Sequence, residues 1–442
     1  MIQIIYFILA ALNSSFFIWY AMVSYSEKEP LATMRSLLLA ITSIPFIAAG
    51  YLPQETGLTI LIILLTLTIV AAVLFYIPFK RLAVENESSG NRIDERNTMF
   101  SRLEITQSPE KTKTYYAENP EHLALDKKWQ IKHGLMSSSS SMYEVKAFAA
   151  AEASFNVIAS LRNSVSPAPL AIKKILNTKD ATVFIKNWAK KLGAIDAGVC
   201  ELKPYHFYSH RGRGKVYGDK VEIHHQYGIA ITVEMDKDYL AAGPAAPTLM
   251  ESAQQYLNSG SIALQLAHFC ANMGYSARAH IDGNYEVVCP LVARDAGLGE
   301  IGRMGLLMTR SLGPRVRIAV ITTDMPLLAD DRKHDATVLD FCDICKKCAE
   351  VCPGQAIPTD DKKEIHGIRR WQINQEECFS YWCTTGTDCG RCMSVCPYSH
   401  PNNRLHNLVR WGIKKSWLFR RMALWMDDFF YGRKPKPIKL KF

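Results

Sequence analysis

Three apolar stretches open the chain, and each approaches the length of a membrane span. They cover residues 2–23, 37–52 and 58–79. A helix needs about 17–25 apolar residues to cross a bilayer, so the first and third stretches are long enough and the middle one is marginal. The pattern predicts three transmembrane helices within residues 1–82.

Basic residues flank these stretches unevenly, which predicts their orientation. Lys28 and Arg35 follow the first stretch, Lys80 and Arg81 follow the third, and the loop PQETG before the third has none. Because Lys- and Arg-rich loops stay in the cytoplasm, we expect the amino terminus outside and everything after Lys80 in the cytoplasm. A re-entrant middle stretch would reverse this topology. The first residues lack the basic start of a cleavable signal, so we expect a multi-pass protein of the cell membrane.

The periodicity changes after a polar linker predicted over residues 83–100. Residues 229–235 and 316–323 have the composition of buried strands, whereas residues 254–273 repeat apolar side chains at helical spacing. This alternation predicts an α/β domain over residues 101–335. Cys200, Cys270 and Cys289 stand singly in apolar surroundings, where a lone cysteine is usually a small core residue.

Charge changes the picture mainly at the carboxyl end. The 442 residues carry a formal net charge of +10, and the tail over residues 404–442 has eleven Lys and Arg against two Asp. Aromatic residues, among them Trp411, Trp417 and Trp425, alternate with these bases, as they do in interfacial helices. A helix that docks its aromatic residues on the domain is the alternative. We do not expect nucleic acid as a partner.

Nine of the twelve cysteines lie between residues 342 and 396, in two runs that each end in Cys-Pro. The first run, CDICKKCAEVCP, contains Cys342, Cys345, Cys348 and Cys352 in the CxxCxxCxxxCP spacing of bacterial iron–sulfur proteins. The second run, CGRCMSVCP, supplies Cys389, Cys392 and Cys396. In two-cluster ferredoxins the fourth cysteine of a run ligates the other cluster, so the second site needs one more thiolate, from Cys378 or Cys383. The spacing predicts two [4Fe–4S] clusters.

Zinc binding and disulfide bonds are the two alternative uses of these cysteines. Zinc sites also use CxxC pairs, but they give no reason for the Cys-Pro ends of both runs. Disulfides suit small secreted scaffolds, and this chain is long.

A glycine-rich segment, DAGLGEIGRMGLL, covers residues 295–307. No clear strand leads into its GxGxxG spacing, so a dinucleotide site is only weakly indicated. The glycines permit the backbone to approach a bulky planar group, and they equally fit a packed turn.

Taken together, several segments resemble one family, the corrinoid-dependent reductive dehalogenases. The similar segments are ERNTMFSR, YYAENPEH, DAGLGEIGR, GPRVRI, the first cysteine run, ECFSYW and TDCGRCMSVCPYSH. Their order and spacing extend the resemblance from about Arg92 to the end of the chain. The resemblance also selects Cys378, in ECFSYW, as the last ligand. It thus implies one cluster on Cys342, Cys345, Cys348 and Cys396 and the other on Cys352, Cys378, Cys389 and Cys392.

The resemblance implies an architecture and a function. A nitroreductase-like α/β domain would hold a cobalamin-type corrinoid, and an appended ferredoxin-like domain over residues 336–403 would carry the two clusters. The implied function is a membrane-anchored reductive dehalogenase that acts on a halogenated organic small molecule. Its other partners would be membrane lipid and an electron donor, namely a ferredoxin, a flavodoxin or a membrane reductant. Respiratory members carry a twin-arginine signal, and this chain has apolar spans in its place.

The resemblance also implies site residues. By order along the chain, Tyr256 matches the family's catalytic tyrosine, Arg315 or Arg317 would be its basic partner, and Asn284 matches a pocket asparagine. A nearby guanidinium favours the phenolate, which would ease proton loss from the tyrosine. Tyr275 is the reserve candidate for the donor. The candidate cofactor-binding residues are Tyr275, Gly297, Gly299 and Arg303.

Two other functions remain open from the sequence. An epoxyqueuosine-reductase-like enzyme would share the corrinoid and the clusters but act on tRNA, and the apolar spans argue against it. A membrane ferredoxin that only relays electrons would not need the long domain that precedes Phe341.

Overall fold

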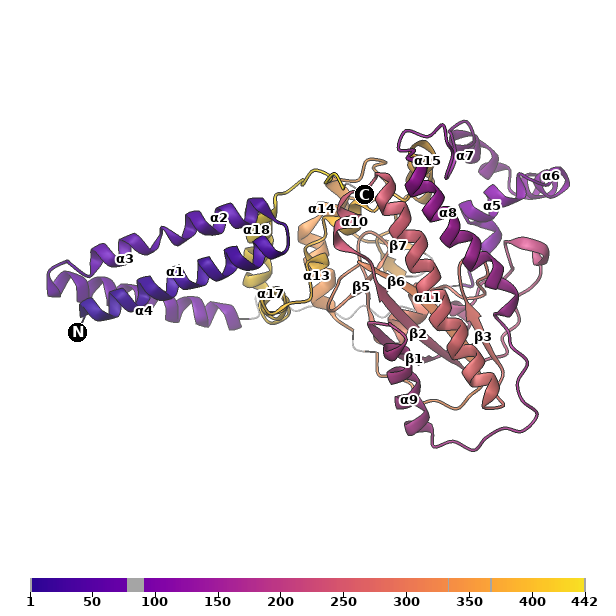
Figure 1. The fold of residues 1–442 in the computed structure, drawn as a ribbon, viewed down its shortest axis with the longest axis horizontal. Helices are drawn as coiled ribbons and strands as arrows, with labels where there is room; N and C mark the ends of the chain where they lie inside the picture. The colour runs from indigo at the N-terminus through magenta and orange to yellow at the C-terminus, as the bar shows by residue number, and fades with distance from the viewer. Residues whose placement is uncertain (1, 78–90, 333, 366–367, 441–442) are drawn as a thin grey trace. The chain divides into compact units, whose positions relative to one another are not determined.

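The computed structural model describes residues 2–77, 91–332, 334–365 and 368–440, which divide into two compact units (Figure 1). The helical unit comprises Met1–Leu82 and Pro401–Pro435, and the α/β unit comprises Ala83–His400 and Lys436–Phe442. The predicted catalytic and ferredoxin-like regions therefore fold as one unit. Most of the predicted tail, by contrast, belongs with the amino-terminal helices. Lys80, Arg81 and linker residues 83–90 lie outside the described residues.

The helical unit is built from both ends of the chain. Its helices are α1 (Ile2–Ser26), α2 (Pro30–Ala40), α3 (Ser43–Ala49), α4 (Gln54–Tyr76), α17 (Arg404–Lys415) and α18 (Trp417–Tyr431). By length and composition, three segments are apolar enough to cross a membrane: α1, α4, and α2 together with α3 over Pro30–Ala49. The middle segment is interrupted at Ile41, directly after α2 ends at Ala40, and Ile41 stands four residues before Pro45. A proline lacks the amide donor and crowds the carbonyl four residues earlier, which accounts for the break.

The α/β unit is centred on a four-stranded antiparallel sheet with the order β1-β2-β6-β3. Its strands are β1 (Asp196–Glu201), β2 (Tyr227–Glu234), β3 (Ala277–His280) and β6 (Val316–Thr323). The two central strands, β2 and β6, are the two that the sequence predicted, and they pair with Ile231 opposite Ala319. Both are buried almost throughout, as expected for strands covered on both faces.

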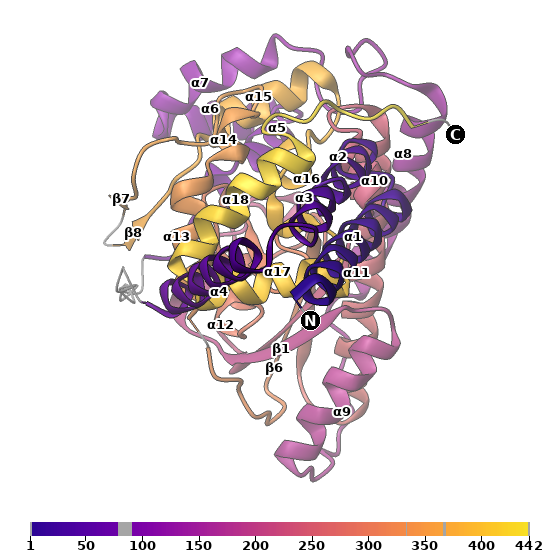
Figure 2. The same cartoon turned by 90° about the vertical axis from the view of Figure 1, so that its left-hand side faces the viewer.

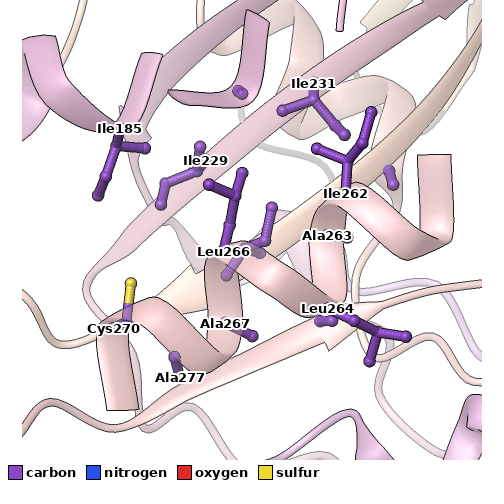
Figure 3. Close-up of a cluster of buried hydrophobic side chains, with 14 of the residues drawn as sticks. Ile185, Ile229, Ile231, Ile262, Ala263, Leu264, Leu266, Ala267, Cys270 and Ala277 are labelled. Atoms are coloured by element: carbon purple, nitrogen blue, oxygen red, sulfur yellow. The ribbon is translucent and has the colours of Figure 1, made fainter. Parts of the chain in front are cut away.

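Helices cover both faces of this sheet. The long helix α11 (Ala246–Asn272) contains the predicted helix and packs Ile262, Leu266 and Cys270 against β2 side chains such as Ile229 (Figure 3). On the other face, α12 (Cys289–Asp295) packs Val292 against Ala230 of β2 and Val320 of β6. Neighbouring strand residues point to opposite faces, so β2 contributes to both cores. Cys200, Cys270 and Cys289 are buried in these cores, as predicted.

Further helices surround this centre. Those ahead of the sheet are η1 (Glu95–Asn97), α5 (Met99–Ile105), α6 (Pro109–Glu118), α7 (Pro120–Gln130), α8 (Val145–Ser160), η2 (Leu161–Ser164) and α9 (Thr178–Lys191). Within and after the sheet follow η3 (Pro204–His206), η4 (Gly214–Val216), α10 (Lys237–Ala241) and the short hairpin β4 (Gly299–Ile301) with β5 (Leu307–Thr309). Helix α8 packs along α11 through Ala147, Phe148 and Ala151, on the side away from β2.

The cysteine-rich segment adds short helices to the same unit (Figure 2). They are α13 (Ala336–Cys345), α14 (Lys347–Glu350), α15 (Gln375–Thr385), α16 (Arg391–Ser394) and η5 (Pro397–Ser399), with a hairpin of β7 (Lys363–Ile365) and β8 (Ile368–Arg370). Left-handed residues separate them: Lys346 (φ 55°) joins α13 to α14, and Gly390 (φ 64°) precedes α16. These sharp turns bring the cysteines of one run close together.

Candidate functional site

The eight cysteines proposed as ligands fall into two neighbouring groups of four. Burial raises the pKa of Cys396 well above its ordinary value, and three nearby thiols raise it further: Cys342, Cys345 and Cys348. Burial raises the pKa of Cys378 to about 12, and the nearby thiols of Cys352 and Cys389 contribute. Burial raises the pKa of Cys392 well above its ordinary value, and four nearby thiols raise it further: Cys389, Cys378 and Cys352 of its own group and Cys348 of the other. The two groups lie next to each other, and the assignment of each cysteine to a cluster stays a prediction.

Cys383 stands apart from both groups. Burial alone raises the pKa of Cys383 to about 11, with no contribution from another cysteine. It is 1% exposed and packs with Trp129 and Phe379. Its surroundings are those of a core residue, whereas Cys378 on the same helix lies beside Cys352 and Cys389.

The chemistry of both groups suits iron–sulfur clusters. All twelve cysteines, each within the described residues, are free thiols. Each group supplies the four thiolates that a [4Fe–4S] cluster requires. Burial disfavours bare thiolates, and a bound metal cluster would stabilise them. Over the described ranges, no three His, Cys, Asp or Glu side chains converge as a single metal ion would need.

Arg303 supports the first cysteine run. Its side chain is fully buried, and Nε donates to the carbonyl of Cys342 at 3.1 Å. Nη1 donates to the carbonyls of Pro358 and Asp360, both at 2.8 Å, and the guanidinium lies 4.5 Å from the ring centre of Trp371. Arg303 was a candidate cofactor-binding residue, and its donors instead hold the loop that carries Cys342.

The glycine-rich segment forms a tight hairpin. A Cβ atom at Gly299 would lie 2.2 Å from the carbonyl oxygen of Met308, so β4 and β5 approach too closely for any other residue. Gly297 has φ 77°, in the left-handed region, just after α12. The packed turn, one of the two interpretations of this segment, accounts for both glycines. No strand–loop–helix dinucleotide motif is formed by these residues.

A second candidate site lies between α11 and β6. The guanidinium carbon of Arg317 lies 4.0 Å from the ring centre of Tyr256. Nη2 of Arg317 donates to the hydroxyl of Ser252 at 2.6 Å, and the Ser252 hydroxyl donates to the Asp388 carboxylate. Asp388 directly precedes Cys389, so this chain of contacts connects the second cysteine run with Tyr256.

Opposing effects set the pKa of Tyr256, and the charge of Arg317 is the largest single one. Arg317 lowers the pKa of Tyr256, but burial together with the carboxylates of Asp282 and Asp388 raises it more. The net pKa is above the ordinary value near 10. The guanidinium thus acts in the expected direction, and burial together with the two carboxylates outweighs it.

Tyr285 is a further member of this site that the sequence did not single out. Burial raises its pKa well above the ordinary value, the nearby Tyr256 and Asp282 raise it further, and Arg317 lowers it. The residue stands next to Asn284 in HIDGNYEV, and that adjacency was the available signal. The site therefore contains two phenols, which share one guanidinium.

Asn284 lies in a neighbouring polar network. Its Oδ1 accepts from Nη2 of Arg211 at 2.5 Å and from Nη2 of Arg278 at 2.6 Å. Its Nδ2 donates to the carbonyl of Arg162 at 3.0 Å, and Arg162 also pairs with Asp282. These bonds fix the asparagine beside the segment that carries Tyr285.

Arg315 and Tyr275 lie away from Tyr256. Arg315 is buried and donates to the carbonyls of Ser399 and Met235 and, at 2.7 Å, to Glu234. It thereby joins the sheet to the end of the second cysteine run. Tyr275 packs in the main core and donates its hydroxyl to the carbonyl of Lys174 at 2.9 Å. Both side chains hold the fold, and of the two arginines only Arg317 contacts Tyr256.

The site retains one unsatisfied donor. Nε of Arg317 is buried and has no hydrogen-bond partner in the part of the chain that the structure describes. A buried donor of this kind is costly unless a bound group accepts from it. Together with the two phenols it makes this region a candidate ligand site.

Comparison with known proteins also indicates iron–sulfur clusters. Residues 341–400 match the family model of the 4Fe-4S dicluster domain. Tetrachloroethene reductive dehalogenase of Sulfurospirillum multivorans is 34% identical over 214 residues, which cover 47% of this chain and 42% of that protein. A tetrachloroethene reductive dehalogenase of Desulfitobacterium hafniense is 34% identical over 193 residues, covering 41% of this chain and 34% of that protein.

The fold points to the same family. A solved reductive dehalogenase, reported with a mechanism for B12-dependent dehalogenation, matches 79% of this chain with a TM-score of 0.63 and 25% identity, over 49% of its own length. The chain spans less than half the length of the curated relatives it matches. Sequence, cysteine domain and fold agree in making this chain similar to the reductive dehalogenases, which are oxidoreductases.

Proposed function

We propose that this protein is a membrane-anchored reductive dehalogenase that replaces a halogen of an organic small molecule by hydrogen. The single observation that carries the proposal is the stacking of Arg317 on Tyr256, connected through Ser252 and Asp388 to the second cysteine run. Replacement of a halogen by hydrogen consumes two electrons and one proton and releases a halide ion. The chain offers an electron route and a proton donor within one unit.

The two cysteine groups would hold the electron carriers. We propose that Cys342, Cys345, Cys348 and Cys396 ligate one [4Fe–4S] cluster and that Cys352, Cys378, Cys389 and Cys392 ligate the other. Residues 341–400 match a dicluster domain, which supports this assignment. The electron donor would be a ferredoxin, a flavodoxin or a membrane reductant.

The corrinoid would lie in the α/β domain, which we propose to be nitroreductase-like. A cobalamin-type corrinoid would supply the strongly reducing cobalt that cleaves the carbon–halogen bond, which is chemistry that no side chain provides. Arg317, Tyr256, Tyr285 and Asn284 are the residues that would face it. The unsatisfied Nε of Arg317 supports a bound group at this place.

Tyr256 would deliver the proton. Its raised pKa keeps the phenol protonated through neutral pH, so the donor is loaded before each turnover. When the proton leaves, the phenolate gains the favourable charge of Arg317, which lies 4.0 Å from the ring centre. Ser252 and Asp388 hold the guanidinium in place, because both contact the same side of Arg317.

The location follows from the helical unit. We propose that α1, α4 and the segment Pro30–Ala49 span the cell membrane and that the α/β unit lies in the cytoplasm. A reducing compartment would preserve the twelve free thiols.

Metal content and halide release test the proposal. The full chain, purified anaerobically in detergent and supplied with a corrinoid, should bind about eight iron atoms and one cobalt per chain. With a strong one-electron reductant it should release halide from a halogenated alkene or aromatic compound. Full iron without cobalt would indicate an electron relay. Full iron and cobalt without halide from any substrate would indicate a different corrinoid-dependent reduction.

A further inference from the structure

The two carboxyl-terminal helices, α17 and α18, pack against one end of the apolar helices. Phe75, next to the last residue of α4, stacks on Trp411 with ring centres 5.9 Å apart and contacts Phe419 at 5.8 Å. Tyr20, in the last turns of α1, meets Phe430 of α18 at 4.6 Å. The carboxyl ends of α1 and α4 therefore both contact the pair formed by α17 and α18.

Polar contacts place the turn between α1 and α2 at the same end. Nε2 of His406 lies 3.0 Å from the carboxylate of Glu27, which also accepts from Asn403. The guanidinium of Arg35, near the start of α2, lies 4.9 Å from the ring centre of Phe429. These contacts involve the carboxyl ends of α1 and α4 and the beginning of α2. Helices α17 and α18 therefore lie at one end of the apolar helices.

The face of α18 that points away from these contacts is apolar. Leu418, Met422 and Trp425 follow one another at helical spacing and are 38%, 44% and 65% exposed. The opposite face of α18 is buried: Arg420, Ala423, Asp427 and Phe430. A stripe of large apolar side chains on the outside of a helix indicates a surface that is covered by something apolar.

Helix α17 combines such a stripe with charge. Leu408 and Trp411 are exposed and lie on the same face as Arg404 and Lys415, again at spacings of three and four. Over residues 401–435 the chain has eight Lys and Arg against two Asp. Tryptophan flanked by Lys and Arg is characteristic of the boundary between the hydrocarbon and the headgroups of a bilayer.

We propose that α17 and α18 lie in the interface of the membrane and bind anionic phospholipid headgroups. Figure 1 shows α18 running across the end of the apolar helices, as a helix in the plane of a bilayer would. The apolar stripe enters the acyl-chain boundary, and the Lys and Arg side chains contact the headgroups. This inference rests on the proposed insertion of α1, Pro30–Ala49 and α4, and it adds a specific lipid contact to it.

Depth-dependent fluorescence quenching tests the lipid contact. The full chain is reconstituted into vesicles of phosphatidylcholine, with or without phosphatidylglycerol, and its emission is compared with that of Trp425→Phe. The difference reports Trp425. The emission of Trp425 should be quenched by lipids brominated near the top of the acyl chain and should be protected from quenching by aqueous iodide. Phosphatidylglycerol should increase both the quenching by brominated lipid and the protection from iodide.

Trp188 is the matched control. It is 37% exposed on α9 in the α/β unit, so the emission lost in Trp188→Phe should be quenched by iodide and not by brominated lipid. If Trp425 behaves like Trp188, the interfacial position is wrong. If quenching of Trp425 does not depend on phosphatidylglycerol, or Arg404→Gln with Lys415→Gln leaves that dependence unchanged, the anionic contact is wrong.

Failure of membrane insertion itself has a separate signature. Alkaline carbonate should leave the parent protein and all three variants in the vesicle pellet. Complete extraction would overturn the proposed spans. A protein that resists carbonate while iodide reaches Trp425 would overturn the interfacial helices alone.

Discussion

Arg317 and Arg315 stand two residues apart in the sequence, yet they serve different parts of the molecule. Side chains two apart would share a face of an extended strand, so the pattern alone could not choose between them. In the structure Arg315 lies just before β6 begins and contacts Ser399 and Glu234, whereas Arg317 lies within β6 and reaches Tyr256 on α11. The sequence was therefore sufficient to name the pair, and tertiary contacts were needed to separate its members.

We expect Arg317→Met to lower kcat by about 10²–10³-fold while iron and cobalt contents stay at the parent level, because one positioned charge at a developing anion contributes this much. Rates are measured as halide release under saturating reductant. Arg317→Lys should recover part of the loss, since it keeps the charge without the planar guanidinium. Arg315→Met should instead lower the unfolding temperature and the retained iron. An Arg317→Met enzyme at the parent rate would remove Arg317 from the mechanism.

Cys378 and Cys383 pose a similar choice within α15. Five residues apart on a helix, they point to different sides, and only Cys378 lies near Cys352 and Cys389. The spacing of the cysteines left both open, because the ligand comes from outside the second run and its distance along the chain is not constrained. Resemblance to the family selected Cys378, which lies near Cys352 and Cys389.

Cys378→Ser should lose about half of the iron, corresponding to one of two clusters, whereas Cys383→Ala should keep all of it. Iron and acid-labile sulfide per chain are measured on anaerobically purified protein. Cys383→Ala removes one buried sulfur from a core and should cost only modest stability. The reverse result, loss in Cys383→Ala and retention in Cys378→Ser, would exchange the two assignments.

At the scale of elements, periodicity located β2, β6 and most of α11, because each has a long buried face. The short elements were missed. Hairpin β4–β5 is only three residues per strand, and its glycines reflect the close approach of two strands and not a cofactor. Helix α12 was also not predicted, although its end carries a buried polar cluster around Asp295. Such clusters form between residues far apart in sequence, which a local pattern does not record.

Asp295 fastens the carboxyl end of α12 to the turn η3. It accepts hydrogen bonds from Tyr205 at 2.5 Å, from Nε2 of His206 at 2.9 Å and from Nε of Arg294 at 2.8 Å. Burial raises the pKa of Asp295, but the bonds from His206, Arg294 and Tyr205 lower it more, so the net pKa falls well below the ordinary value. The ionised carboxylate therefore stabilises the folded state.

Because the folded-state pKa is depressed, this contribution is present above the unfolded value near 4 and is lost as the pH falls through the folded-state pKa. Asp295→Asn should lower the free energy of unfolding at pH 7 by about 1–3 kcal/mol. The unfolding temperature of the parent should approach that of the variant as the pH falls below about 4. Thermal unfolding of the full chain in detergent measures both. A constant gap between the two proteins down to the lowest pH would contradict this role.

At the scale of the whole molecule, the main surprise is that both ends of the chain build one unit. The sequence showed apolar stretches at the beginning and a basic, aromatic tail at the end, and it left open where the tail docks. Amphipathic faces reveal that a helix has a partner but do not identify it. Packing of Phe75 on Trp411 and of Tyr20 on Phe430 supplies that information.

The orientation of the protein in the membrane is the prediction at this scale. Protease added outside intact cells should leave the α/β unit uncut, because the end of the helical unit with Lys28, Arg35 and the basic helices α17 and α18 should face the cytoplasm. The readout is a blot for a tag at the carboxyl terminus. A tag inserted between Leu52 and Pro53, at the opposite end of the spans, should be accessible from outside. Cleavage of the α/β unit in intact cells would reverse the topology.

The central claim is that Tyr256 gives the proton that replaces the halogen, and a single-turnover measurement of halide release tests it most directly. Parent, Tyr256→Phe and Tyr275→Phe are loaded to equal iron and cobalt content, reduced, and mixed with one equivalent of substrate. Phenylalanine keeps the packing of the ring and removes only the hydroxyl, so Tyr256→Phe should release halide about 10²–10⁴-fold more slowly than the parent. Tyr275→Phe should match the parent. Equal rates for the parent and Tyr256→Phe would contradict the account.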